Sequence, residues 1–180
     1  AVPITQAVMS FDAGAAADVP DKLGTQAVML ASLEEGAGER DSIELAEVQE
    51  RLGMQINAAS SADRTNVSLQ APSANLSGAI DIFADVVRNP TFDPAEVARV
   101  KNQSLARIAA ELSNPNGLAA RALPPLIYGT ASPYAKLAAG SGDAKAVAAL
   151  TPADLKAFHS AWLRPEKAKL FVVSDRPIDE

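Results

Sequence analysis

The order of apolar and polar residues predicts a β-hairpin in the first half of the chain. Within residues 54–59, and again within 66–70, apolar side chains occupy every second position. A period of two is typical of a strand with one buried face. Turn-forming residues around Ala62-Asp63-Arg64 separate the two segments, and Pro72 follows the second. We therefore expect two antiparallel strands joined by a turn.

Two further segments are expected to be strands. Residues 6–11 form the first, and a loop of small and turn-forming residues, FDAGAAADVPDKLG, overlaps its end. The run KAKLFVVSD, residues 167–175, forms the second. It is apolar on both faces, and this favours a central place in the sheet.

Apolar residues recur at helical spacing through most of the remaining chain. The expected helices cover residues 24–35, 42–53, 75–89, 93–112, 117–128, a short segment after the cap Asp143, and 151–163. Good capping residues stand at several starts, namely Asp41 or Ser42, Asp93, and Thr151. Pro94 and Glu96 favour a start with a capping box at Asp93. Pro124-Pro125 is expected to bend or break the 117–128 helix, and residues 129–142 are expected to form a loop.

The elements follow one another as strand, two helices, hairpin, a long helical block and a final strand. Because strands do not alternate with helices, this order predicts an α+β fold with a mostly antiparallel sheet and several helices packed on one face. With 180 residues, the chain is long enough for one domain with a sizeable core. We expect residues 1–180 to form a single domain, and we expect this domain to be a fragment of a longer chain.

Charge and composition exclude several classes of function. The formal net charge is −6, and Lys and Arg are scattered, so we expect no nucleic-acid partner. No apolar run approaches the roughly 20 residues that span a bilayer, so we expect no membrane span. Cysteine is absent, which excludes disulfides, thiol catalysis and cysteine-bound metal.

The residues that carry chemistry form no recognisable catalytic group. His159 is the single histidine of the sequence, no nucleophile motif accompanies it, and we expect it to have a structural or a surface role. The glycine-rich segment 138–146 lacks the spacing of a phosphate loop and is expected to be a turn and a helix cap. Glu34 and Glu35 are adjacent on a helix, where side chains diverge, and we interpret them as a solvated helix end. Asp63 and Arg64 belong to the expected turn.

Several segments together resemble a known family. FDAGAAADVPDKLG, EEGAGERDS, LGMQINAASSADRTNVSLQA, VVRNPTFDPAEVARVKNQ, LIYGTASPY and ALTPADLKAFHSAWLRPEKAKLFVVSD occur in this order at suitable spacing. This ordered set, which covers roughly residues 7–175, resembles one domain of the pitrilysin/insulinase family of zinc peptidases. The resemblance implies the α+β fold described above.

The resemblance also implies where zinc chemistry would lie. Active members carry His-x-x-Glu-His on the helix that corresponds to residues 24–35, where two histidines bind zinc and the glutamate activates water. This sequence has Ala27 and Ala31 at the histidine positions and Leu30 at the glutamate position. We expect this helix to have been rebuilt as core, with Ala27 and Ala31 packed against the 93–112 helix.

The third zinc ligand of the family is a glutamate on a later helix, and it corresponds to Ala106 or Arg107 here. Glu111 lies about a turn away and is a poor substitute. We therefore assign no catalytic residue, no metal-binding residue and no cofactor, and no substrate-binding residue is identified.

The resemblance implies a non-catalytic domain that contributes to peptide binding, or to the chamber of a protease that an active zinc-bearing partner of the same family completes. Its ligand would be an unfolded peptide, and its location the periplasm or cell envelope, with the cytoplasm as the alternative. A purely structural or assembly domain with the same fold is the second hypothesis. An independent enzyme with an unrecognised site is the third.

Overall fold

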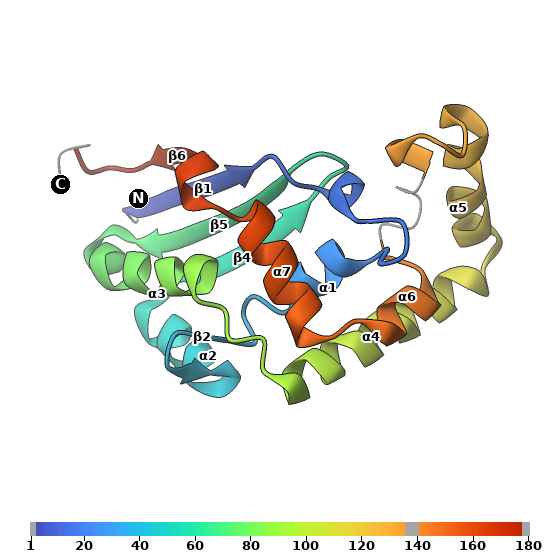
Figure 1. The fold of residues 1–180 in the computed structure, drawn as a ribbon. Coiled ribbons are helices and arrows are strands. Elements are labelled where there is room, and N and C mark those ends of the chain that lie inside the picture. The colour runs from blue at the N-terminus through green and yellow to red at the C-terminus, as the bar shows by residue number, and fades with distance from the viewer. Residues whose placement is uncertain (1–2, 136–140, 178–180) are drawn as a thin grey trace.

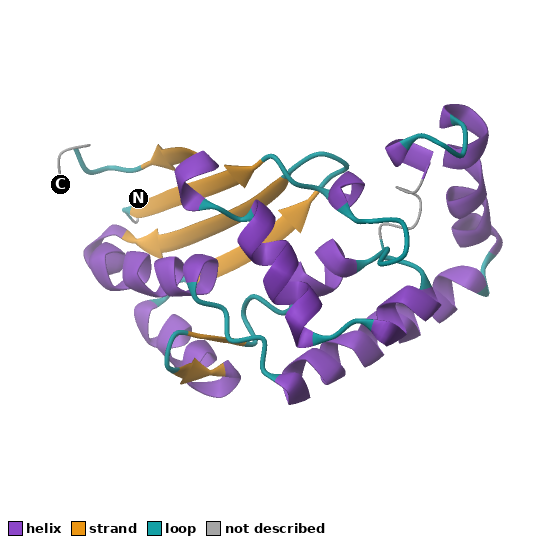
Figure 2. Cartoon of the chain, viewed as in Figure 1, coloured by secondary structure: helices purple, strands orange, loops and turns teal. Residues whose placement is uncertain are grey.

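The computed structural model describes residues 3–135 and 141–177, and in these residues it has a four-stranded antiparallel sheet with helices on one face (Figures 1 and 2). The strand order is β4-β5-β1-β6. The strands are β1 (Ile4–Phe11), β4 (Gln55–Ser60), β5 (Thr65–Pro72) and β6 (Lys169–Val173). A separate short ladder pairs β2 (Gly36–Ala37) with β3 (Arg40–Asp41). The predicted α+β class and antiparallel sheet are confirmed.

The predicted hairpin is present and has the predicted period of two. Ile56 of β4 is paired with Leu69 of β5. On the face toward the helices, Val67 and Leu69 are fully buried, whereas Asn66 and Gln70 on the opposite face are exposed. A shift of one residue would exchange these two sets, so burial of one face fixes the register.

Strand β6 does not lie in the centre of the sheet, and that prediction was wrong. It pairs with β1 on one side, and no other strand of the described residues pairs with its other side. Phe171 and Val173 are 58% and 73% exposed. A run that is apolar on both faces does not distinguish a central strand from an edge strand whose apolar side chains are exposed.

Seven α-helices are present in the described residues. They are α1 (Thr25–Ala31), α2 (Ser42–Leu52), α3 (Leu76–Arg88), α4 (Pro94–Leu112), α5 (Pro115–Tyr128), α6 (Ala144–Ala149) and α7 (Pro152–Trp162). The caps predicted at Asp41, Asp93, Asp143 and Thr151 all accept hydrogen bonds from backbone N–H groups of the first turn. At Asp93 the predicted box is incomplete, because the Glu96 carboxylate bonds to Ser42 and Arg99 instead.

Helix α1 is shorter than predicted and begins with an unusual cap. The carboxylate of Asp18 accepts hydrogen bonds from the N–H groups of Gly24, at 2.6 Å, and Gln26, at 2.8 Å. Gly24 has a φ of 104° and lies so close to Gly142 that an added Cβ would be 2.8 Å from the Gly142 Cα. Glycine is therefore required at position 24 both by the backbone conformation and by this close approach.

Helix α5 is continuous through Pro124 and Pro125, where a bend or break was predicted, and it begins at Pro115 rather than at residue 117. The prolines leave carbonyls of the preceding turn without an N–H donor. No residue of α5 is buried. In Figure 1, α5 stands apart from the sheet, at the end of the molecule opposite the two termini.

Candidate functional site

The main candidate site is a groove between α1, β4 and the C-terminal part of α4, with a cavity volume of about 550 Å³. We call it the groove throughout. Its lining residues are Ala27, Leu30, Ala31 and Glu34, residues 57–60 of β4, Arg107 and Glu111 of α4, and Ser141. This volume lies in the range of ordinary ligand sites.

One wall of the groove is the outer edge of the sheet. Strand β4 pairs with β5 on one side, and no strand of the described residues pairs with its other side. Four consecutive residues of β4, 57–60, line the groove. A free strand edge presents unpaired backbone N–H and C=O groups, which bind another extended chain.

The opposite wall is the outer face of α1. Ala31 is exposed, and Ala27 and Leu30 are half-buried, whereas Val28 and Met29 on the inner face are fully buried. The expectation that Ala27 and Ala31 had become core residues was therefore wrong. Alanine and leucine occur both in protein cores and on the surfaces of grooves, so residue type alone did not distinguish a core position from a groove position.

The third wall carries the charged residues of α4. Burial raises the pKa of Glu111, but hydrogen bonds from Ser141 and Arg121 outweigh it, and the pKa lies below its ordinary value. The Glu111 Oε2 atom accepts from the Ser141 hydroxyl at 2.5 Å and from an Arg121 Nη2 donor at 2.7 Å. Arg121 also donates to the Gly142 carbonyl at 3.0 Å. Glu111 is thus charged and joins α4 to α5 and to residues 141–142.

Glu34 and Glu35 diverge as predicted, but they are not a solvated helix end. Burial raises the pKa of Glu34, whose carboxylate lines the groove and accepts a 3.4 Å hydrogen bond from Gln49. Glu35 instead forms an ion pair with Arg99 of α4. Sequence spacing gave no sign of the residues that these two carboxylates meet.

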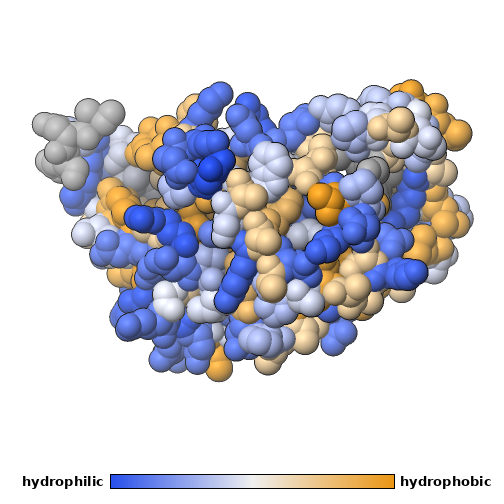
Figure 3. Space-filling view, in the orientation of Figure 1, coloured by the Kyte–Doolittle hydropathy of each residue, from blue (hydrophilic) through white to orange (hydrophobic). Residues whose placement is uncertain are grey.

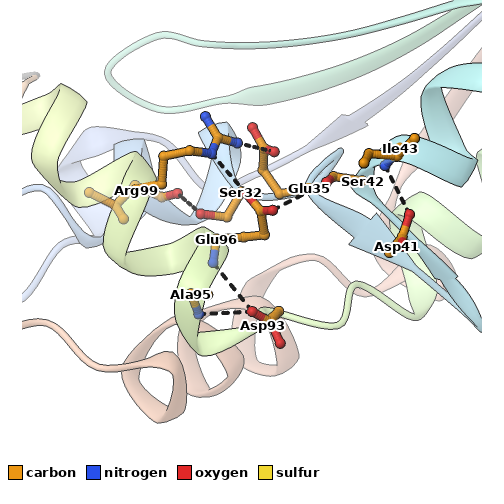
Figure 4. Close-up of polar contacts among 10 residues, drawn as sticks. Ser32, Glu35, Asp41, Ser42, Ile43, Asp93, Ala95, Glu96 and Arg99 are labelled. Carbon is orange, nitrogen blue, oxygen red and sulfur yellow. Dashed lines mark hydrogen bonds and ion pairs between the residues drawn. The ribbon is translucent and has the colours of Figure 1, made fainter.

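The ion pair of Glu35 belongs to a polar cluster that holds α1 against α4 (Figure 4). Arg99 also pairs with Glu96, at 2.8 Å, and Glu96 accepts a 3.2 Å hydrogen bond from the Ser42 hydroxyl. The cluster thus connects the segment after α1, the start of α2 and the first turns of α4. None of these four residues is among the residues that line the groove.

A contact that the sequence did not indicate lies beside the hairpin. The Tyr134 hydroxyl donates to the Asp63 carboxylate at 2.8 Å, and so connects the segment after α5 to the tip of the β4–β5 turn. Arg64 in the same turn pairs with Asp12, again at 2.8 Å. The predicted turn at Asp63 and Arg64 is present, and both side chains have specific partners.

Comparison with known proteins identifies the family. Residues 3–133 match the family model described as insulinase, peptidase family M16. The chain belongs to this family. One similar solved structure is a peptidase M16 inactive domain from Pseudomonas fluorescens, with 33% sequence identity, a TM-score of 0.92, and coverage of 99% of this chain and 43% of that one.

Two other solved structures share the fold at lower identity. The periplasmic protease PqqL from Escherichia coli has 20% identity and a TM-score of 0.80, with 98% of this chain and 20% of that chain covered. Pitrilysin has 21% identity and a TM-score of 0.76, with 99% and 19% covered. This chain therefore spans less than half the length of these relatives. No curated protein sequence matches it.

Ala27, Leu30, Ala31 and Arg107 all line one cavity. The resemblance to zinc-bearing family members predicts their two histidines at residues 27 and 31, the glutamate at residue 30, and the third ligand at residue 106 or 107. Of the two positions considered for the third ligand, Arg107 lines the groove, and Ala106 is not one of its lining residues. The alignment made from sequence thus brings four separate positions to one place.

These residues do not fit a zinc ion. Zinc takes nitrogen, sulfur or carboxylate oxygen ligands, whereas the side chains here are two methyl groups, an isobutyl group and a guanidinium cation. Among the residues that the structure describes, no group of three or more His, Cys, Asp or Glu side chains is placed to hold a metal ion. Within the same residues, no helix is both long and apolar enough to cross a membrane.

The single histidine of this M16 domain lies in the core, and of the two expected roles this favours the structural one over the surface one. His159 Nε2 is 2.8 Å from the Val87 carbonyl, and the ring packs edge-on against Phe92 at a centroid distance of 5.9 Å. Because a carbonyl only accepts hydrogen bonds, Nε2 carries the proton. Burial lowers the pKa of His159, which favours the neutral ring. His159 is not part of the groove lining and has a structural role.

Proposed function

We propose that this chain is a non-catalytic M16 domain that binds an unfolded peptide in the groove, next to an active zinc-bearing partner of the same family. The observation that carries this proposal is the free edge of β4 along a groove whose metal-ligand positions hold Ala27, Ala31 and Arg107. The groove keeps the shape for a peptide without the residues that would cut it.

An extended peptide is the ligand that this edge fits best. A strand laid beside β4 would form backbone hydrogen bonds with residues 57–60, and such bonds are independent of the peptide sequence. The other walls, from α1 and α4, would then enclose the peptide side chains. Binding of this kind suits a protein that handles unfolded chains of varied sequence.

Hydrolysis is assigned to the partner. The groove residues with charged or hydroxyl groups are Glu34, Ser60, Arg107, Glu111 and Ser141. Glu111 is engaged by Arg121 and Ser141, and Leu30 replaces the glutamate that would activate water. General-base catalysis of peptide hydrolysis also needs a means of polarising the carbonyl, which zinc supplies in active members.

Helix α5 supports the idea of a partner. Its inner face carries Arg121, Pro124 and Pro125, which are partly buried. On its outer face, Leu126 and Ile127 are 80% and 61% exposed. Figure 3 shows apolar residues gathered at the end of the molecule where α5 lies. Exposed apolar patches of this kind mark interaction surfaces in soluble proteins.

Strand β6 is a second exposed surface, besides α5, that supports the presence of a larger assembly. Its free edge and apolar side chains lie near the termini, far from α5 in Figure 1. Apolar edge strands invite pairing with other chains unless they are covered. We propose that residues 1–180 form one domain of a longer chain and that another part of the assembly covers this edge.

A location in the periplasm or cell envelope is part of the same proposal. It is supported by the periplasmic location in the printed name of the E. coli relative. An unfolded peptide that crosses or is released in the envelope would be the natural ligand there. Fractionation of cells that produce the tagged full-length protein tests this directly.

The experiment that tests peptide binding uses fluorescence anisotropy of a labelled unfolded peptide. Ala31→Trp places a large side chain in the groove, and Ala98→Trp makes the same change at an exposed position of α4 outside it. We expect binding by the parent chain and by Ala98→Trp, weaker binding by Ala31→Trp, and an uncut peptide in mass spectra. Absence of binding in the parent chain would favour the purely structural domain instead.

A further inference from the structure

We propose that the guanidinium group of Arg107 binds a carboxylate of the peptide that occupies the groove. The carboxylate comes either from an acidic side chain or from the C-terminus of the peptide. This inference rests on the proposed function, because it assumes a peptide beside β4. It adds a preference for one anionic group to a mode of binding that is otherwise independent of sequence.

Arg107 is a cation of the groove lining without an ion-pair partner. It is an exposed residue of α4 and lines the groove together with Ala27 and Ala31 of α1. Among the described residues, it forms no ion pair and donates no hydrogen bond. The methyl groups of the two alanines cannot accept a hydrogen bond from it. Its donors are therefore available to a ligand.

Glu111 is the carboxylate that sequence spacing would pair with Arg107. Residues four apart on a helix are neighbours on one face, and opposite charges at this spacing form ion pairs. Glu111 Oε2 accepts instead from the Ser141 hydroxyl at 2.5 Å and from Arg121 Nη2 at 2.7 Å. Burial raises the pKa of Glu111, and these two hydrogen bonds lower it by more than the charge of Arg107 does. Arg121 thus neutralises Glu111, and the charge of Arg107 remains for the groove.

Glu34 is the second carboxylate of the groove lining, and it is a weak competitor for Arg107. It accepts a 3.4 Å hydrogen bond from Gln49 of α2. Burial raises its pKa, which means that its surroundings disfavour the charged form. A peptide carboxylate that arrives from solvent therefore meets an unpaired cation, with both acidic neighbours in the groove either paired or partly buried.

The geometry of arginine suits a carboxylate ligand. A guanidinium group presents parallel N–H donors in a planar fork, and these bind both oxygens of a carboxylate. A peptide that fills the groove displaces water from around Arg107, and the attraction between the two charges then becomes stronger than on an open surface. The whole chain carries a net charge of −6, which favours cationic peptides at long range. A preference for a carboxylate therefore reports a local site.

The test uses three N-acetylated nine-residue peptides of alternating threonine and serine. The first has a central glutamine and a C-terminal amide, and so carries no carboxylate. The second has a central glutamate and a C-terminal amide, and the third has a central glutamine and a free C-terminus. We expect the second or the third peptide to bind the parent chain about tenfold more tightly than the first, the effect of one charge-assisted pair. Isothermal titration calorimetry gives the three dissociation constants and shows which carboxylate is bound.

Variants of the protein then locate the carboxylate. We expect Arg107→Gln to reduce the preference to within about twofold, because the side chain keeps hydrogen-bond donors but loses the charge. Arg88→Gln removes the same charge at an exposed position of α3 that is not part of the groove lining, and it is expected to keep the full preference. Thermal melting checks that both variants are folded, as expected for exposed positions.

The possible outcomes separate this inference from the proposed function. Equal binding of all three peptides by the parent chain would overturn the carboxylate site and leave peptide binding intact. A preference that Arg107→Gln does not change would also overturn it, because the carboxylate would then be bound elsewhere. No binding of any peptide would overturn the proposed function and the carboxylate site together.

Discussion

Ala31 of α1 and Arg107 of α4 line the same groove, although they come from separate helices. The family resemblance predicts ligands of one metal ion at these two positions in zinc-bearing members, and the position of both residues in one groove supports that prediction. We propose that this chain has an open groove where active members hold zinc.

The two faces of α1 are expected to respond differently to mutation. Ala31→Leu changes an exposed side chain and is expected to alter the free energy of unfolding by less than about 0.5 kcal/mol. Met29→Ala removes a fully buried side chain and is expected to cost about 2–5 kcal/mol. Urea unfolding of both variants measures this. A large loss of stability in Ala31→Leu would mean that the position belongs to the core after all.

His159 is expected to make stability depend on pH near neutrality. Its pKa is lowered from 6.5 by burial, so the unfolded chain binds the proton first as the pH falls. The contribution of the neutral ring is complete above about pH 6.5, and it is lost progressively as the pH falls toward the lower pKa of the folded state. His159→Gln keeps a donor for the Val87 carbonyl but does not titrate.

Unfolding free energies between about pH 7 and pH 5 check this expectation. The parent chain should lose more stability over this range than His159→Gln does. Parallel curves for the two proteins would show that His159 titrates as it does in the unfolded chain, contrary to its observed burial.

Restoring the zinc ligands tests the alignment through chemistry. We expect the variant with Ala27→His, Leu30→Glu, Ala31→His and Arg107→Glu to bind zinc, because these four positions share the groove. The matched control keeps Arg107, whose cation opposes the metal, and is expected to bind zinc more weakly. Isothermal titration calorimetry compares the two. Equal affinities would place residue 107 away from the metal and contradict the alignment on α4.

The outer face of α5 is expected to contribute to association between protein molecules and not to the free energy of unfolding. Leu126 is 80% exposed, so Leu126→Lys should change the free energy of unfolding by less than about 0.5 kcal/mol. The same change should reduce self-association of the isolated chain in sedimentation velocity at high concentration. Ile43→Lys, at a 68% exposed position of α2, serves as the control. If both variants behave alike, α5 has no special role in association.

The sequence predicted much of this fold because its signals are local. The period of two in β4 and β5, and caps such as Asp41 and Thr151, depend on neighbouring residues and were confirmed. The position of β6 in the sheet depends on residues far away, and apolar character alone gave the wrong answer.

The position of the candidate site could be predicted from the sequence, but the burial and the contacts of its residues could not. The family resemblance located Ala27, Leu30 and Ala31, yet it did not show whether they face the core or a groove. Burial depends on which helices pack on α1, and no pattern within residues 24–35 contains that information. The partners of Glu111 and the contact between Tyr134 and Asp63 likewise depend on tertiary structure.

Backbone hydrogen exchange of β4 with and without an unfolded peptide tests the central claim most directly. The claim is that a peptide binds as an added strand along residues 57–60 and is not cleaved. We predict that a saturating peptide slows exchange in β4 more than elsewhere, and that the peptide is recovered intact. Unchanged exchange in β4 while the peptide is bound, or recovery of cleaved peptide from the metal-free protein, would contradict the account.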